Sequence, residues 1–393
     1  YSVVFRKAEQ TNELEDITGE ILLKTVDSWI NREKRDGGKL GVKFSFDRAL
    51  LYHDRDIYTA EPFSPPSEEL HRVLKLEVGN GCQYAKCTYC TEYGQARFHI
   101  KRFQAFQEHI AEVRKKLDGD LGNIQRLFLG GGDIFAMPTD KLLQYVDAAR
   151  STFDNQQYTP YNRNNIRRIA AFTRTEGIEK KSIKEMNTLY EHGLNMLFWG
   201  IETGSDQVLQ YVNKNINYDR MEKAGKKAVQ SKIQISTMIM TGLGGLKHYE
   251  DHVVQTAKLL NTVQPRFITF MSINAAPFSP YADIMAEEQA RGENMPLSPE
   301  MIVEQMYDIV GLLDERLYIN QKRCLVAAYR LPVERIAENP IQFRGRLEYS
   351  EKRNIQRTLS NYFYRRQPSP LIPDTSFNQD SPLRRKAEQI AAK

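Results

Sequence analysis

Apolar and polar residues follow two different periods between positions 71 and 318. Short segments in which every second residue, or nearly every residue, is apolar predict strands, and longer stretches with apolar residues three and four positions apart predict helices. The expected strands span residues 72–78, 126–129, 169–172, 196–201, 233–241 and 267–273. Because a helical stretch follows each strand, the pattern predicts an α/β fold whose parallel sheet curls into a partial (β/α)6 barrel.

Several expected helices carry signals at their ends. Ser182 with Glu185 three residues later forms the pattern of a capping box, and Gly193 ends the same helix. A long helix is expected from Ser298, because the proline that follows it suits a first helical position. Ser205 is the expected N-cap of the helix after the fourth strand.

The alternation does not extend over the whole chain. Residues 1–70 are expected to form an N-terminal extension and residues 319–366 a C-terminal appendage, both mostly helical, with one strand around 325–328. The segment 367–393 is rich in proline, serine and aspartate and is expected to be a linker or disordered tail. Arginines interleaved with aromatic residues at 344–366 would suit RNA, although a solvent-facing helix surface is the commoner cause of such a pattern.

Composition limits the function classes. The chain is 41% hydrophobic and 27% charged, which is typical of a soluble globular protein. No apolar run approaches the length of a membrane span and no signal peptide opens the sequence, so we expect no membrane partner. Clustered rather than paired cysteines favour a reducing cytoplasm. A net charge of +5 permits a nucleic-acid partner without arguing for one.

Three of the four cysteines, Cys82, Cys87 and Cys90, lie in one loop with the spacing C-x4-C-x2-C. Such crowding predicts a metal centre, since three thiolates that converge suit soft iron or zinc. A structural zinc site would need a fourth ligand such as His99. A plant-type two-iron cluster would need the distant Cys324. The third interpretation is a four-iron cluster held by three cysteines, with one iron open to a ligand.

Two further motifs follow later strands. Gly130-Gly131-Gly132-Asp133 ends the second strand, and Gly-Ile-Glu-Thr-Gly-Ser-Asp begins at Gly200. Together with the cysteine loop they resemble radical S-adenosylmethionine (SAM) enzymes, in the branch of the elongator catalytic subunit, the methylthiotransferases and the oxygen-independent coproporphyrinogen oxidases. The resemblance covers residues 70–320. The usual spacing in that superfamily is C-x3-C-x2-C, so the extra residue here points to a subgroup.

The resemblance implies a TIM-like barrel, a 4Fe-4S cluster and SAM as cofactors, and an oxygen-sensitive enzyme. Electrons from the cluster would break the bond from the sulfonium to the 5′ carbon, and the 5′-deoxyadenosyl radical would abstract hydrogen from a substrate. The implied metal ligands are Cys82, Cys87 and Cys90. The implied SAM contacts are Tyr89, Gly130, Gly131, Gly132, Asp133, Glu202, Ser205, Gly242 and Gly244.

Simpler interpretations stay open for several of these residues. Tyr89 would otherwise shield a cluster, Asp133 would cap a helix, and Ser205 would serve only as an N-cap. His248 and His252 stand four positions apart on one helix, but we expect two surface histidines rather than a metal pair. Cys324 is expected to be a buried thiol.

The substrate is not encoded in a motif. No further cysteines precede Cys82 for a second cluster, and residues 1–70 are too short for a cobalamin domain, which leaves a small molecule or a biosynthetic intermediate. A modified RNA is the less favoured target. An electron donor such as flavodoxin or ferredoxin is the expected protein partner. The alternatives are an iron–sulfur electron carrier and a zinc-stabilised binding protein.

Overall fold

The chain is described from a computed structural model. It describes residues 51–52, 54–59, 63–68, 73–91, 97–117, 121, 124–154, 166–273, 279–314, 324–328, 343–346, 352–353, 355–357 and 359. The chain divides into the units Tyr1–Leu50 and Leu51–Lys393, and every described residue lies in the second. Most of the expected N-terminal extension and C-terminal appendage, and all of the expected tail 367–393, lie outside the described residues.

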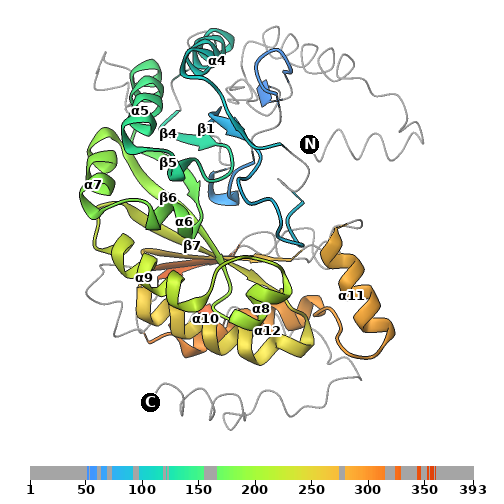
Figure 1. Ribbon diagram of the computed structural model, residues 1–393. Helices are drawn as coiled ribbons and strands as arrows, with labels where there is room; N and C mark the ends of the chain where they lie inside the picture. Colours follow the sequence, from blue (N-terminus) through green and yellow to red (C-terminus); the bar gives the residue numbers. More distant parts are fainter. Residues whose placement is uncertain are drawn as a thin grey trace, which may run out of the picture. The chain divides into compact units, whose positions relative to one another are not determined.

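An eight-stranded sheet forms the centre of this unit (Figure 1). Its order is β1-β4-β5-β6-β7-β8-β9-β10, and all neighbours are parallel except β9 and β10. The strands are β1 Val73–Glu77, β4 Arg126–Gly130, β5 Arg168–Thr173, β6 Leu194–Glu202, β7 Gln234–Thr241, β8 Phe267–Ser272, β9 Leu325–Ala328 and β10 Phe343–Arg346. The six expected strands and the strand near 325–328 are confirmed, and β9 adds a seventh parallel strand to the partial barrel.

The helices, apart from α11 at the right of the view, run along the outside of the parallel strands (Figure 1). They are α4 Phe103–Lys116, α5 Thr139–Phe153, α6 Thr175–Glu179, α7 Ile183–His192, α8 Asp206–Tyr211, α9 Tyr218–Val229, α10 Tyr249–Val263, α11 Pro280–Ala290 and α12 Pro299–Leu312. The capping box at Ser182 is confirmed, and Gly193 ends α7 with φ 114°. Helices α6, α9 and α11 were not expected from the sequence.

Short elements connect these segments. A hairpin pairs β2 Gly79–Asn80 with β3 His99–Ile100, and single turns of 3-10 helix occur at η1 Pro66–Glu68, η2 Ile134–Ala136 and η3 Leu246–His248. Within the part of the chain that is described, no helix has both the length and the hydropathy of a membrane span.

The core follows the period of two in the strands. Leu127 and Leu129 belong to the large apolar cluster shared with the helices, whereas Phe128 between them belongs to a second cluster. In that second cluster the Phe128 ring meets Phe172 edge-on at 5.1 Å between ring centres and Phe198 at 6.3 Å. Three phenylalanine rings therefore pack together on the inner side of the sheet.

Candidate functional site

The cysteine loop, residues 81–90, is fastened to the loop after β4. The side-chain amide of Gln83 donates to the carbonyl oxygen of Asp133 at 2.7 Å, and the Asp133 amide donates to Oε1 of Gln83 at 3.3 Å. This pairing joins residues fifty positions apart in the sequence. It fixes the first part of the cysteine loop against a strand end, as expected when loops after parallel strands meet at one edge.

A second attachment joins the cysteine loop to the end of α8. The amide of Thr88 donates to the carbonyl of Val212 at 3.0 Å, and the Tyr84 hydroxyl donates to the carbonyl of Asn213 at 2.7 Å. The side chain of Asn213 returns a hydrogen bond to the carbonyl of Lys86 at 3.0 Å. The loop that carries the cysteines is thus held at two places, by contacts that its own sequence pattern does not reveal.

The three cysteines are half-buried. Burial is the main cause that raises the pKa of Cys87 to about 11, while the nearby Lys214 lowers it and Cys90 raises it. No group of three or more His, Cys, Asp or Glu side chains among the described residues is arranged to hold a metal ion. His99 lies exposed on β3, where its ring nitrogen Nδ1 is 3.4 Å from the carbonyl of Arg97.

The donor set fits an iron–sulfur cluster in its chemistry. Thiol sulfur is the ligand type that such clusters use, and a bound cation would favour the deprotonated form that burial disfavours. Cys324, directly before β9, is 1% exposed, and burial raises its pKa to about 12. The expectation of a buried thiol there is confirmed. The roles of Cys82, Cys87 and Cys90 as ligands stay predictions.

The glycines after β4 allow close contact with the cysteine loop. A Cβ on Gly132 would lie 2.2 Å from the carbonyl oxygen of Gly81 and 3.0 Å from Cα of Cys82. A Cβ on Gly131, which has φ 121°, would lie 2.6 Å from the carbonyl oxygen of Gly79. The predicted cofactor contact of these glycines is untested, but the structure gives them a reason of its own, because only glycine fits between the two backbones.

Asp133 is buried with an unpartnered oxygen. The residue is only 3% exposed, and its Oδ1 atom has no hydrogen-bond partner among the described residues. Burial raises its pKa to about 7, against the opposing effects of Arg174 and Thr173. Asp133 precedes η2 without a side-chain capping bond, so capping does not explain it. Gly130 before it is buried at the end of β4, and its carbonyl accepts the amide of Val78 at 3.0 Å.

A buried ion pair lies at the end of β6. Lys214 donates to Oε1 of Glu202 at 3.0 Å and to the carbonyl of Gly200 at 2.8 Å, and both charged residues are almost fully buried. Glu202 has φ 64°, which is uncommon for a residue with a side chain. Burial is the main cause that raises the pKa of the partly buried Tyr89, and the charge of Glu202 raises it further. Sequence reasoning missed Lys214, because nothing in its neighbourhood marks it as a partner of Glu202.

Ser205 is the N-cap of α8, as expected. Its hydroxyl accepts the amide of Val208 at 3.1 Å and donates to Asp251 of α10. The hydroxyl is therefore fully engaged inside the protein, and its predicted contact with SAM stays a prediction.

The expectation of two surface histidines is wrong for His252. This residue is 0% exposed, and neither ring nitrogen has a hydrogen-bond partner among the described residues. Thr256, one helical turn further along α10, accepts the amide of Gly204 at 2.9 Å. The same face of α10 therefore packs on the loop after β6, and this tertiary contact buries a residue that its polarity placed outside. Burial lowers the pKa of His252 to about 3, so the ring is neutral.

The turn after β7 has its polar groups engaged. The amide of Gly242 donates to Oε1 of Gln305 at 2.8 Å, and the amide of Gly244 donates to the hydroxyl of Tyr281 at 3.1 Å. That hydroxyl donates to the carbonyl of Gly242 at 3.3 Å, and the side chain of Asn294 donates to the carbonyl of Gly244 at 3.1 Å. The predicted SAM contacts of Gly242 and Gly244 are untested, and the structure shows which protein groups hold this turn.

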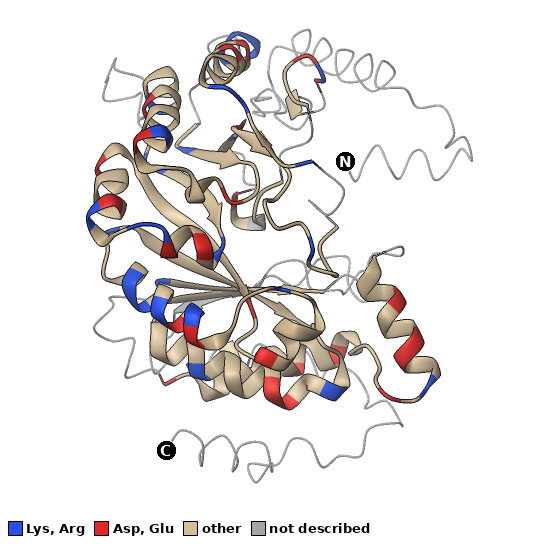
Figure 2. Cartoon of the chain, viewed as in Figure 1, with Lys and Arg blue, Asp and Glu red and all other residues tan. Residues whose placement is uncertain are grey.

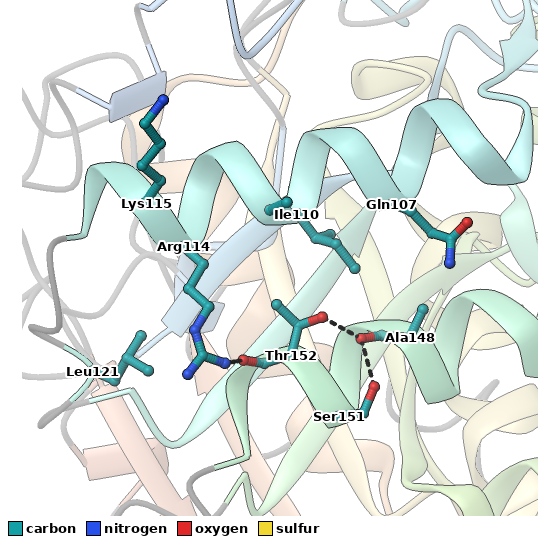
Figure 3. Close-up of a pocket in the computed structure, with 9 residues that line it drawn as sticks. Gln107, Ile110, Arg114, Lys115, Leu121, Ala148, Ser151 and Thr152 are labelled. Atoms are coloured by element: carbon teal, nitrogen blue, oxygen red, sulfur yellow. Dashed lines mark hydrogen bonds between the residues drawn. The ribbon is translucent and has the colours of Figure 1, made fainter.

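One cavity, of about 810 Å³, lies apart from these loops between α4 and α5 (Figure 3). Three of its polar side chains bond within the protein: Arg114 donates to the carbonyl of Thr152, and both Ser151 and Thr152 donate to the carbonyl of Ala148. None of the predicted site residues lines it, so we do not connect it with the site.

Comparison with known proteins finds one matching family model. The model of the radical SAM superfamily matches residues 76–260, a span that includes the three clustered cysteines and all of the predicted SAM contacts. No curated protein sequence matches the chain.

Solved structures of similar fold show low identity. Methylornithine synthase (PylB) is 14% identical with a TM-score of 0.43, covering 76% of this chain and 82% of that one. Elp3 of the archaeon Methanocaldococcus infernus is 13% identical with a TM-score of 0.43, covering 75% and 63%. HydG, a maturase of the FeFe-hydrogenase, is 14% identical with a TM-score of 0.42, covering 64% of this chain but only 51% of its own. Similarity at this level does not indicate which reaction the chain catalyses.

Proposed function

Because residues 76–260 belong to the radical SAM superfamily, whose cofactors are a 4Fe-4S cluster and SAM, we propose that Cys82, Cys87 and Cys90 hold that cluster. When bound, the cluster would supply the electron that cleaves SAM to a 5′-deoxyadenosyl radical, which abstracts hydrogen from a small molecule or a biosynthetic intermediate. The chain is thus a radical SAM enzyme with one cluster.

The single observation that carries this proposal is the anchoring of the cysteine loop. Gln83 ties it to the end of β4, and Thr88 ties it to the end of α8. Two attachments on either side of Cys87 restrict where the thiols can move, and a preorganised loop is what a cluster with one open iron needs. A structural zinc site would instead need a fourth protein ligand, and His99 lies exposed on β3.

The surrounding residues would hold SAM and exclude water. Lys214 and Glu202 put a buried pair of opposite charges near Cys87, as their effects on the pKa of that thiol indicate. Partly buried Tyr89 lies in the same environment. Such a site would bind a zwitterionic ligand such as SAM, because buried charges attract a charged ligand more strongly than charges exposed to bulk water do. It supports the predicted contacts of Tyr89 and Glu202, whereas those of Asp133 and Ser205 rest on the sequence motifs alone.

We favour a small substrate over RNA, because basic and acidic side chains are mixed and paired on the described helices. Figure 2 shows basic and acidic residues interspersed on them. On α9, Arg220 pairs with Glu179 at 2.5 Å, and Lys226 pairs with Glu222. Paired charges leave little excess for phosphate binding. We further propose a cytoplasmic protein that receives electrons from a flavodoxin or a ferredoxin.

Anaerobic reconstitution with iron and sulfide, followed by dithionite and SAM, tests the proposal. We expect about four irons per chain, with release of 5′-deoxyadenosine and methionine. Cys87→Ala should lose the iron and the cleavage, whereas the matched control Cys324→Ala should keep both. Two irons or bound zinc, with SAM recovered intact, would favour an electron carrier or a zinc-stabilised protein instead. Equal loss of iron in the two variants would replace the open-iron site by a four-thiolate one.

A further inference from the structure

Helix α11 directs one backbone donor at the cysteine loop. Ser279 caps the helix by accepting the amide of Ala282 at 3.2 Å, and Pro280 at the first position has no amide hydrogen. The next amide, that of Tyr281, lies at a helix start where no partner exists within the helix. It donates to the carbonyl of Thr88 at 3.1 Å. Tyr281 therefore holds the cysteine loop between Cys87 and Cys90.

The hydroxyl of the same residue holds the turn at residues 242–245. It accepts the amide of Gly244 at 3.1 Å and donates to the carbonyl of Gly242 at 3.3 Å. Tyr281 is 2% exposed, and burial raises its pKa to about 12, so the hydroxyl keeps its proton and can donate. Removing this oxygen would leave a buried amide without a partner, which costs more than the hydrogen bond itself is worth.

The ring of Tyr281 connects the two contacts through a small apolar cluster. It meets the Tyr211 ring edge-on, with 6.1 Å between ring centres at 88°. The cluster also contains Val208 of α8 and Leu243 of the glycine turn, and Tyr89 of the cysteine loop packs against it. One side chain thus shares its surroundings with two of the loops whose residues are predicted to contact SAM.

We propose that Tyr281 is a positioning residue that couples the cysteine loop to the turn at residues 242–245 and thereby sets the affinity for SAM. The inference rests on the proposed function. It assigns the first turn of α11 a part in cofactor binding, through its contacts with these two loops. The ring and the backbone amide fix the cysteine loop, and the hydroxyl fixes the turn.

Tyr281→Phe tests the coupling, because it removes only the hydroxyl and keeps the ring. Tyr145→Phe is the matched control, since Tyr145 is 6% exposed and its hydroxyl donates to the carbonyl of Lys101 at 2.7 Å, outside both loops. Hydrogen exchange of the iron-free chain should be faster at residues 242–245 in Tyr281→Phe alone. After reconstitution, equilibrium dialysis with SAM and the oxidised cluster should show affinity about tenfold weaker, with unchanged iron content.

The outcomes separate the inference from the proposed function. Unchanged exchange in the turn, or faster exchange with unchanged affinity for SAM, would each overturn the coupling. A parallel loss of iron would also overturn it, because the variant leaves the amide of Tyr281 and the cysteine loop intact. If the wild-type chain binds neither iron nor SAM, the proposed function fails and the coupling fails with it. Thermal unfolding of both variants checks that each is folded.

Discussion

The turn after β4, residues 130–133, and the turn after β7, residues 242–245, look alike in sequence but use glycine differently. In the first, Gly132 lies so close to the backbone of Gly81 that no Cβ fits. In the second, Gly242 and Gly244 adopt φ 84° and 89°, and the atoms nearest to a Cβ placed on either of them belong to side chains. The first turn therefore fixes the cysteine loop directly. In the second turn, side chains from other elements hold the backbone conformation, and Tyr281 connects this turn to the cysteine loop.

Gly132→Ala should give the largest effect, because the added Cβ would clash with the backbone of Gly81 and Cys82 in the cysteine loop. We expect displacement of the cysteine loop, a loss of about 3 kcal/mol or more in the free energy of unfolding, and little or no iron after reconstitution. Gly311→Ala is the control, since its Cβ would meet only a side-chain nitrogen, 3.3 Å away, and it lies in α12. Iron analysis and urea unfolding measure both. Normal iron content in Gly132→Ala would show that the close approach does not position the cysteines.

Asp133→Asn distinguishes the two turns by their response to pH. The pKa of Asp133 is about 7 in the folded chain and ordinarily 3.8, so folding is most favourable when the group is protonated. This contribution is present below pH 3.8 and is lost as the pH rises to about 7. At pH 8 the asparagine variant should be more stable by up to a few kcal/mol, and at pH 4 nearly equal.

Chemical unfolding of the iron-free chain at several pH values measures this difference. Gly242→Ala serves as a comparison, because the turn after β7 contains no carboxylate of its own and the effect of that variant should vary little with pH. A constant difference between Asp133→Asn and the wild type across the range would mean that the buried carboxylate does not titrate near neutrality.

Gly242→Ala should have a moderate effect of another kind. The positive φ costs a residue with a Cβ about 1–2 kcal/mol, and the nearest atom, Cγ2 of Ile273 at 2.7 Å, belongs to a side chain that can move. We expect iron content to stay unchanged while the affinity for SAM falls. Iron loss as complete as in Gly132→Ala would erase the distinction between the two turns.

Much of the fold could be predicted, because the strands and their crossover helices carry local periodicity. The ends of α7 and α12 were found from Ser182 and Ser298. Helix α11 begins with the same signal, Ser279 followed by Pro280, and was not predicted. Helix α9 was missed because its buried face consists largely of small residues, such as Ala224 and Ala228.

The candidate site was predictable in its motifs but not in its connections. The cysteines and glycines stand out because their types and spacings are rare. Lys214 does not, because its pairing with Glu202 depends on how α8 folds back towards β6. Tyr281 is one of twenty tyrosines, and only the tertiary structure places it between two loops. The burial of His252 likewise follows from packing and not from local sequence.

Gln83→Ala, which changes the cysteine loop and not the turn itself, should give the smallest effect of these variants. Gln83 is exposed, so its two hydrogen bonds to Asp133 compete with water and should contribute about 1 kcal/mol. We expect full iron content but faster loss of iron to a chelator, since the loop opens more often while Gly132 still contacts it. Gln104→Ala is the control, because Gln104 is exposed on α4 and bonds only Glu108 at 3.1 Å among the described residues. Equal rates of iron loss in the two variants would mean that backbone contact alone, and not the Gln83 pairing, fixes the loop.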